Sequence, residues 1–375
     1  MTGNLPLSGV RVFELGGNVA GPYATWILAE LGAEVTKVER PEGDDCRGWG
    51  PPCWQGQSTL FQAINRNKDS AVYDLKTDAA AERLRADLID KADVVLQSLR
   101  PGIVERFGLD AARLTAENPR LIYCNLRAFG ATGPLKDRPG YDALIQAFGG
   151  IMSVTGEEGR PPVRAGISAI DMGTGLWCAI GILAAIVRRQ LTGQGGVVDA
   201  SLFETALAWM SFYSADYQTT GNIPVRHGSG VRGIVPYQAF ECSDGYLIVA
   251  ASNDRLFVKL AEALGKPEWA DDPKFRDNRN RSANRDELIG LIGDILGPKT
   301  RAHWQEILDA AGVPCAPTQS IDEVLAHPQT EALGIAQQAT ADGFKLIGLP
   351  LSFDGERPPL RTLAPKLDAA NDDAA

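Results

Sequence analysis

VRVFELGGNVAGPYATWILAELGAEVTKVE, residues 10–39, contains the local pattern from which the fold class can be predicted. Residues 10–15 and 34–39 have the apolar, β-branched character of short strands. A glycine-rich loop and a helix over 23–31 join them. A strand, a helix and a second strand in this order form a βαβ unit, which indicates a parallel α/β sheet.

The same alternation of strands and helices continues further along the chain. Strand-like stretches lie at 70–75, 92–97, 121–126 and 197–202, and a helical pattern covers 78–89. Strands that alternate with helices over such a length predict a Rossmann-like sheet.

A long apolar helix is predicted after Asp171, and another helix over 204–216. The first carries residues at the i, i+3, i+4 and i+7 spacing of a buried face. These residues are Ile180, Leu183, Ala184 and Val187. The longest apolar run, 176–187, is short of the ~20 residues that a membrane span needs.

A change in composition at 217–233 indicates a linker or mobile loop, because this stretch is polar and glycine-rich. Beyond it, 237–242 and 246–251 have the pattern of a β-hairpin. Helical patterns then cover 254–264, 284–296 and 301–311. We therefore expect a smaller α+β domain over 234–330.

The composition excludes several classes of function. The chain has 37 Lys and Arg residues against 47 Asp and Glu, a formal net charge of −10 at pH 7. This balance argues against general nucleic-acid binding and against an anionic membrane surface. Six scattered cysteines contain no CxxC pair, so neither a zinc site nor a disulfide framework is expected. The N-terminus shows no signal-peptide pattern. We expect a reduced, cytoplasmic protein.

Asp171 is the first candidate for chemistry. It lies in IDMGTG, residues 170–175, at the start of the predicted apolar helix. The glycines allow another molecule to approach the backbone closely. The helix N-terminus favours negative charge, so we expect a lowered pKa and an ionised carboxylate nucleophile. The alternative is an ordinary helix N-cap.

Basic residues recur at or just after the ends of predicted strands. They are Arg40, Lys76, Arg100 and Arg106. Ligands of an open parallel sheet bind at the carboxyl edge of its strands, so these four side chains could converge on phosphates. For each residue alone a solvated surface charge is the better interpretation, and only the repeated placement at strand ends favours a site.

The glycine-rich loop after the first strand invites comparison with the dinucleotide fingerprint. GGNVAG, residues 16–21, places its second glycine at position two rather than position three of G-x-G-x-x-G. Glu39 could serve as the ribose-binding acid. The spacing nevertheless argues against a dinucleotide.

The three histidines point away from histidine chemistry. His227, His303 and His327 share no ligand spacing, which argues against a metal site or a His-based triad. The glycines around His227 indicate a loop that could move over a site. Tyr141 and Asp142 follow a Gly-Pro-rich loop and could share a cleft with Asp171.

The chain closely resembles the class III CoA-transferase family (CaiB/BaiF type) from Leu5 to about Lys366. The resemblance depends on several motifs in the same order. They are LAELGAEVTKVER (28–40), NRNK (65–68), DLK (74–76), RPG (100–102), NPRLIY (118–123), DRPGYD (137–142), the Asp171 segment, PYQAF (236–240) and AGVPCAP (311–317).

The resemblance implies a Rossmann-like, CoA-binding large domain over 1–216 that the segment 331–375 completes. It also implies a 217–233 linker, a small α+β domain over 234–330, and two chains interlocked as a homodimer. It identifies Asp171 as the catalytic aspartate, which takes CoA from an acyl-CoA donor and passes it to a carboxylic acid through an aspartyl-CoA thioester. CoA is then a substrate, and no tightly bound cofactor is implied.

The resemblance also implies positions that line the CoA site. They are Asn18, Arg40, Tyr73, Lys76 and Arg106, with Ser98 and Leu99 where many relatives have Asn-Phe. Val19 stands where relatives acting on formyl-CoA and oxalate carry Gln. Gly228 and Gly230 lie in a stretch that corresponds to the glycine-rich loop of those relatives.

Two alternatives remain beside a CoA-transferase. Racemases of 2-methylacyl-CoA share the fold but have His-Asp in place of Tyr141 and Asp142, and this chain has no histidine there. A non-catalytic CoA-binding protein is the other alternative. For a transferase, we expect a small dicarboxylic acid, with Arg164, Arg226 or Arg232 as partners for its distal carboxylate.

Overall fold

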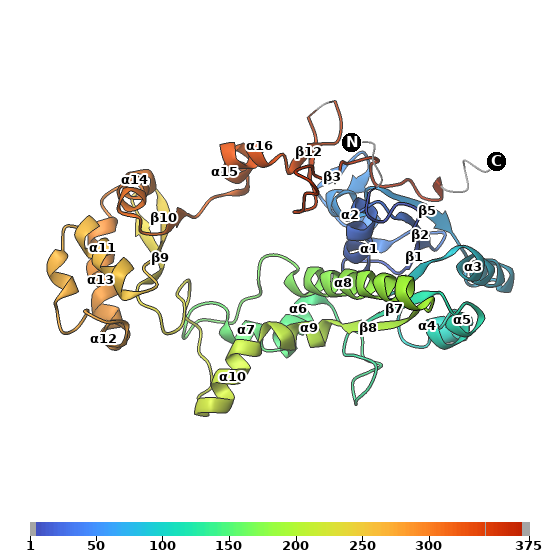
Figure 1. Ribbon diagram of the computed structural model, residues 1–375, viewed down its shortest axis with the longest axis horizontal. Coiled ribbons are helices and arrows are strands. Elements are labelled where there is room, and N and C mark those ends of the chain that lie inside the picture. The colour runs from blue at the N-terminus through green and yellow to red at the C-terminus, as the bar shows by residue number, and fades with distance from the viewer. Residues whose placement is uncertain (1–4, 342, 370–375) are drawn as a thin grey trace. The chain divides into compact units, whose positions relative to one another are not determined.

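The computed structural model describes residues 5–341 and 343–369, which form two compact units (Figure 1). Unit 1 consists of the described residues of 1–151, 164–222 and 328–375. Unit 2 consists of 152–163 and 223–327. The segment 152–163, which falls inside the large domain predicted from the sequence, thus belongs to unit 2.

Unit 1 is built on a six-stranded parallel sheet, which confirms the predicted α/β class. Its strands are β1 (Arg11–Leu15), β2 (Glu34–Glu39), β5 (Lys68–Val72), β6 (Val94–Gln97), β7 (Ile122–Arg127) and β8 (Gly196–Ser201). Their spatial order is β5-β2-β1-β6-β7-β8. The order of the strands reverses between β1 and β6, which is where doubly wound sheets bind their ligands.

The strands are apolar because both faces of the sheet are covered. Val94 and Leu96 of β6 lie in one core with α1 (Ala20–Glu30) and α8 (Ala169–Thr192). Val95 points to the opposite face and belongs to a second core. That core includes residues from α3 (Asp78–Lys91) and α5 (Ala111–Glu117). Side chains that alternate along a strand therefore serve two cores.

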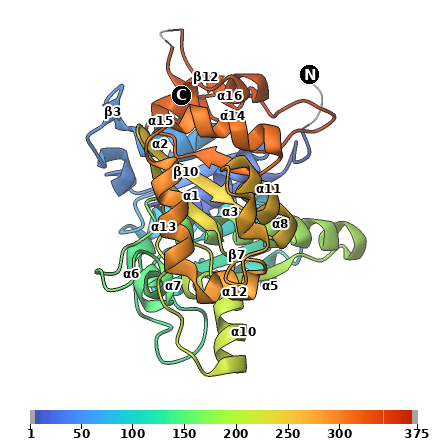
Figure 2. The same cartoon turned by 90° about the vertical axis from the view of Figure 1, so that its left-hand side faces the viewer.

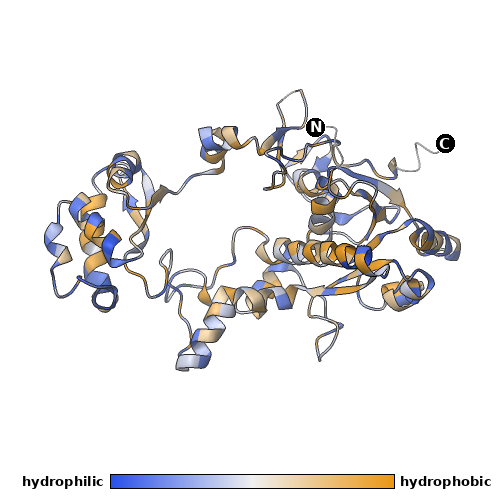
Figure 3. Ribbon diagram, in the orientation of Figure 1, coloured by the Kyte–Doolittle hydropathy of each residue, from blue (hydrophilic) through white to orange (hydrophobic). Residues whose placement is uncertain are grey.

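Helix α8 corrects two sequence predictions. It is longer than the predicted apolar run, and by length and composition alone it could cross a membrane, although half of its most apolar window is buried inside the fold. The predicted buried face is wrong: Ile180, Ala184 and Val187 are exposed. The buried face includes Cys178, Ile182 and Ile186. Figure 3 shows why, since α8 is hydrophobic along most of its length and the periodicity fits two faces.

Other boundaries differ more modestly from the predictions. The predicted helix over 204–216 is two helices, α9 (Leu202–Trp209) and α10 (Ser211–Thr220). The remaining described elements of unit 1 are short. They are η1 (Asp45–Gly48), β3 (Cys53–Trp54), β4 (Gln57–Ser58), α2 (Thr59–Asn65), α4 (Ile103–Arg106), α6 (Asp142–Phe148), α16 (Pro328–Leu333), β12 (Ala336–Gln338) and β13 (Lys345–Ile347). Helix α7 (Ile151–Val154) spans a boundary between the units.

The C-terminal segment returns to unit 1. The backbone N–H groups of Arg361 and Thr362 both donate to Asn67 Oδ1 at 2.8 Å. Arg47 Nη1 donates to the carbonyl of Pro365 at 2.9 Å. Residues nearly 300 positions apart are thereby joined beside β5.

Unit 2 is an α+β unit with its own core. Strands β9 (Tyr237–Cys242) and β10 (Gly245–Ala250) form the predicted hairpin, and β11 (Cys315–Pro317) pairs with β10. Helices surround this sheet, as Figure 2 shows for α11, α13 and α14. They are α11 (Asp254–Ala263), η2 (Pro267–Ala270), α12 (Asn278–Ala283), α13 (Arg285–Leu296), α14 (Arg301–Ala311) and α15 (Ile321–Ala326).

Candidate active site

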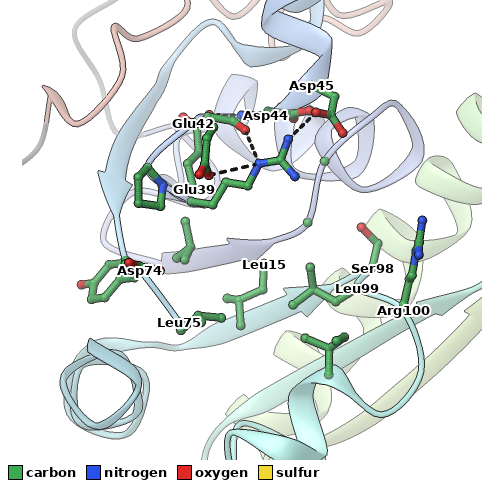
Figure 4. A pocket seen from close by; sticks show the side chains of 18 of the residues that line it. Leu15, Glu39, Glu42, Asp44, Asp45, Asp74, Leu75, Ser98, Leu99 and Arg100 are labelled. Atoms are coloured by element: carbon green, nitrogen blue, oxygen red, sulfur yellow. Dashed lines mark hydrogen bonds and ion pairs between the residues drawn. The ribbon is translucent and has the colours of Figure 1, made fainter. Parts of the chain in front are cut away.

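A cavity of about 830 Å³ lies in unit 1 at the carboxyl ends of the parallel strands (Figure 4). Its walls are the segments that follow β1, β2, β5 and β6, together with α4. The cavity therefore includes the point where the strand order reverses, which is the expected place for a ligand.

The cavity brings together most of the site residues predicted from the sequence. Its lining includes Asn18, Arg40, Tyr73, Lys76, Ser98, Leu99, Arg106 and Tyr141. Arg100 also lines it, so all four basic residues at strand ends face one cavity. Val19 does not line it, because this residue is buried at the N-cap of α1.

A buried ion network fixes the first loop of this cavity. Lys37 Nζ lies 2.6 Å from Glu14 Oε1 and 2.8 Å from Asp44 Oδ2, and it also donates to the carbonyl of Gly16 at 3.2 Å. Asp44 Oδ1 accepts from the N–H of Asn18 at 3.3 Å. A Cβ at Gly17 would lie 2.7 Å from the Asp44 carboxylate, so only glycine fits there. The loop is thus held from two sides by charged groups.

The charges in this network are mutually stabilised. Burial alone would raise the pKa of Glu14, but the ammonium groups of Lys37 and Lys68 outweigh burial and lower this pKa to about 2. Lys68 Nζ donates to Glu14 Oε2 at 2.9 Å. Burial lowers the pKa of Lys68 to about 8, although Glu14 acts in the opposite direction. None of these residues was predicted as part of the site; the only local signal was Glu14, a charged side chain between Phe13 and Leu15 in β1.

Acidic side chains pair with two of the basic residues that line the cavity, Arg40 and Lys76. Arg40 is paired with Asp45 and, at 3.7 Å, with Glu42, two acids that Figure 4 labels. Lys76 Nζ lies 3.8 Å from Glu42 Oε1. The Tyr73 hydroxyl donates to Asp87 Oδ2 at 2.7 Å. An anionic ligand that reaches Arg40 must therefore exchange places with these carboxylates.

Asp171 is not the N-cap of its helix. Ser168 holds that position, and Asp171 is the third residue of α8. The carboxylate of Asp142 accepts from the N–H groups of Ile170 at 2.8 Å and of Asp171 at 3.2 Å, both through Oδ2. The amides that we expected to stabilise the Asp171 carboxylate are thus engaged by another acid.

The pKa of Asp171 is accordingly raised, not lowered as the sequence suggested. Burial raises it to about 7, and the negative charge of Asp142 adds to this effect. Near neutral pH the carboxyl group is present in both its ionised and its protonated form. Such perturbed carboxyl groups are a feature of catalytic sites.

Two cavity segments adjoin the start of α8. Tyr141 lines the cavity, and the next residue, Asp142, is bonded to the backbone of Asp171. One helical turn after Asp171, a Cβ at Gly175 would lie 2.8 Å from the carbonyl of Ala20. Ala20 follows the cavity residue Asn18 by two positions. The first turns of α8, which carry Asp171, therefore pack against both segments.

The other predicted loop residues belong to unit 2. The Gly228 N–H donates to the carbonyl of Gly156 at 2.8 Å, and the Gly230 N–H to that of His227 at 2.9 Å. The guanidinium of Arg226 donates to two backbone carbonyls of the same unit, at Glu157 and Arg160. It is engaged in holding its loop.

Comparison with known proteins identifies the family. The sequence model described as CoA-transferase family III matches residues 7–371. The chain belongs to CoA-transferase family III. The succinyl-CoA:glutarate CoA-transferase of Mus musculus is 36% identical over 92% of this chain and 79% of its own length. The acetyl-CoA:oxalate CoA-transferase of Acetobacter aceti is 36% identical over 97% and 93%.

The fold comparison agrees with this assignment. A CaiB/BaiF family protein from Brucella suis superimposes with a TM-score of 0.89 and 38% sequence identity, covering 99% of both chains. The resemblance predicted from the sequence motifs and the class of enzyme are thereby confirmed. In this family III CoA-transferase, the roles of the individual site residues remain predictions.

Proposed function

We propose that this enzyme transfers CoA from an acyl-CoA donor to a small carboxylic or dicarboxylic acid through a thioester on Asp171. The observation that carries the proposal is the cavity at the reversal of strand order. All seven residues predicted to bind CoA line it. Asp171 is not among the lining residues, but the lining residue Tyr141 is followed by Asp142, which accepts from the N–H of Asp171. Relatives whose names specify succinyl-CoA, glutarate and oxalate support a small acid as acceptor.

The proposed chemistry needs only one nucleophile. An oxygen of Asp171 attacks the thioester carbonyl of the donor, which forms a mixed anhydride and releases CoA thiolate. The thiolate attacks the aspartyl carbonyl and frees the donor acid as its carboxylate. The acceptor carboxylate then displaces CoA thiolate from the aspartyl thioester, which forms a second mixed anhydride. The thiolate attacks the acceptor carbonyl of this anhydride, which forms the new acyl-CoA and releases the Asp171 carboxylate. Each step exchanges one activated acyl group for another, so no external reductant, oxidant or proton is consumed.

The environment of Asp171 suits this role. A carboxylate whose pKa lies near 7 is more basic, and so a stronger nucleophile, than a solvated aspartate. It is still substantially ionised at neutral pH. None of the described residues that line the cavity is a histidine, which favours acyl transfer over the proton abstraction of a racemase.

The direct test is chemical trapping. Incubation with succinyl-CoA followed by hydroxylamine should convert Asp171 to its hydroxamate, because both the anhydride and the thioester react with this nucleophile. Peptide mass spectrometry locates the modification. An unmodified Asp171 under conditions of turnover would contradict the proposal.

The acidic rim of the cavity leads to a prediction about affinity. Asp45→Asn should tighten CoA binding about 2–5-fold at low salt, because Asp45 competes with phosphate for Arg40. Isothermal titration with CoA measures the change. Asp90→Asn, an exposed acid on α3, is the matched control for the change in net charge. Equal affinity in both variants would show that Arg40 does not bind the phosphates.

We further propose that two chains interlock as a homodimer in the cytoplasm, as the family resemblance implies. Exposed apolar side chains on α8, α9 and α10 support this. They are Leu176, Trp177, Ile180, Val187, Leu191, Leu207, Trp209 and Phe212. Such an accumulation exceeds what an isolated surface normally presents.

Phe212, which is 84% exposed, tests the dimer. Phe212→Asp should weaken association and shift the mass measured by light scattering from two chains toward one, because a charge would be buried in the interface. Phe212→Leu keeps the apolar contact and should remain a dimer. A wild-type mass of one chain would rule the dimer out.

A further inference from the structure

The start of α8 is held by a side chain that belongs to a different helix. Asp142, the first residue of α6, is 7% exposed and does not line the cavity. Its Oδ2 atom accepts from the N–H groups of Ile170 and Asp171. The first amides of a helix have no partner within the helix and need such acceptors. The side chain of the N-cap residue, Ser168, does not accept from them.

A second buried residue fixes the orientation of this carboxylate. Gln146 is fully buried, and its Nε2 donates to Asp142 Oδ1 at 2.5 Å. Its Oε1 accepts from the N–H of Ala165 at 2.8 Å. The amide of Gln146 therefore cannot turn over without losing both bonds. All three contacts of Asp142 come from donors, which is the pattern that a carboxylate requires.

We propose that Asp142 is a positioning residue. It binds the first amides of α8, so that these amides do not stabilise the carboxylate of Asp171. This assigns Asp142 a role different from the substrate contact expected from the sequence. It rests on the proposed function of Asp171 as the nucleophile. Asp142 acts through Asp171 and does not itself touch the reacting atoms.

The position of Asp142 has an electrostatic consequence. Its charge and burial both favour the protonated form of Asp171. The other ionisable groups on the elements packed against α8 are Tyr23 and Glu30 on α1, Tyr123, Cys124 and Arg127 on β7, Asp199 on β8 and Glu204 on α9. Glu30 is paired with Arg66, Asp199 with Arg127, and Glu204 is bonded to Ser201. Among the described residues, only Asp142 shifts the pKa of Asp171 through its charge.

The geometry allows the two effects of Asp142 to be separated. Asp142→Asn removes the charge and retains an oxygen for the amides of α8. Its new NH₂ group, however, faces the NH₂ group of Gln146, and neither can accept from the other. Adding Gln146→Glu restores a complementary pair, because the introduced carboxylate accepts from the new side-chain amide at position 142 and from the N–H of Ala165. In the double variant the bonds return while the charge moves to the next turn of α6. Asp137→Asn, five residues earlier and exposed, is the matched control.

The first readout is the pH dependence of kcat for CoA transfer. The nucleophile must be ionised, so wild-type activity should fall as the pH drops through about 7. In Asp142→Asn this acidic limb should move down by roughly one pH unit, because the like charge is gone. The control should keep the wild-type limb. An unmoved limb in Asp142→Asn would overturn the electrostatic part of the proposal, since a purely structural role changes kcat without moving the limb.

The second readout is hydrogen exchange of the peptide that contains Ile170 and Asp171. Exchange should be at least about tenfold faster in Asp142→Ala, intermediate in Asp142→Asn, and near wild type in the variant that combines Asp142→Asn with Gln146→Glu. Wild-type exchange in Asp142→Ala would overturn the proposal. This measurement needs no turnover, so it decides whether Asp142 holds α8 even if trapping shows that Asp171 is not the nucleophile.

Discussion

Asp171→Asn should lower kcat for CoA transfer by at least about 10⁴-fold, because an amide cannot form the anhydride or the thioester through which CoA is exchanged. The substitution is nearly isosteric and leaves the backbone N–H of residue 171 free to donate to Asp142. Loss of activity can therefore be attributed to the missing nucleophile. The measurement is transfer from succinyl-CoA to a panel of carboxylic acids, followed by chromatography of the CoA esters.

Stability provides the control for this variant. A carboxyl group whose pKa is raised on folding destabilises the protein increasingly as the pH rises from its unfolded value of 3.8 to about 7, and by a constant amount above that. Asn carries no charge for burial to penalise. Asp171→Asn should therefore be at least as stable as the wild type at pH 8, as judged by thermal unfolding. An active variant, within tenfold of the wild type, would show that Asp171 is not the nucleophile.

The sequence predicted the sheet well because its strands obey a simple rule. Strands covered on both faces are rich in apolar residues, as β6 (VVLQ) is. The alternation of valines with polar residues in β2 also placed that strand at its observed bounds. Strand β5 spans 68–72, whereas the sequence predicted a strand over 70–75, because the observed strand begins with the charged residues Lys68 and Asp69. The buried charge of Lys68 is neutralised by Glu14, 54 residues earlier, and its ammonium group also donates to the carbonyl of Pro22 and to Asn65 Oδ1. Local patterns contain no information about such a partner.

The candidate site was likewise predictable from the sequence only in part. Basic residues at the carboxyl ends of parallel strands must meet at one edge, so the convergence of Arg40, Lys76 and Arg106 followed from topology. The environment of Asp171 did not. Its helix position favoured a lowered pKa, whereas burial raises this pKa, and the charge of Asp142, 29 residues earlier, adds to the effect. The fold around Asp171 thus reversed the local expectation.

Glu14→Gln should destabilise unit 1 by about 3–5 kcal/mol, because it leaves two buried lysines without their shared carboxylate. Glu14, Lys37 and Lys68 have side chains with no exposed surface. Gln can accept from one ammonium group but cannot neutralise it. Denaturant unfolding, followed by tryptophan fluorescence, measures the change in the free energy of unfolding.

Glu117→Gln is the matched control, because Glu117 forms a partly exposed pair with Arg85 at 2.8 Å. The same chemical change there should cost less than about 1 kcal/mol. Adding Lys68→Met to Glu14→Gln should recover part of the loss, since it removes the buried ammonium group that has lost its carboxylate, while Lys37 keeps its pair with Asp44. Equal effects of Glu14→Gln and Glu117→Gln would show that the buried network contributes no more than a surface pair.

The pH dependence of this difference identifies its origin. The pKa of Glu14 is lowered on folding, from 4.5 to about 2, so its stabilising contribution is complete above pH 4.5 and is lost as the pH falls toward 2. The gap in stability between the wild type and Glu14→Gln should therefore narrow over that window. A gap caused only by altered packing would stay constant.

Because Lys37 also bonds the carbonyl of Gly16, the network links the stability of the sheet to the loop that begins the cavity. Glu14→Gln should then weaken CoA binding as well, although Glu14 itself does not line the cavity.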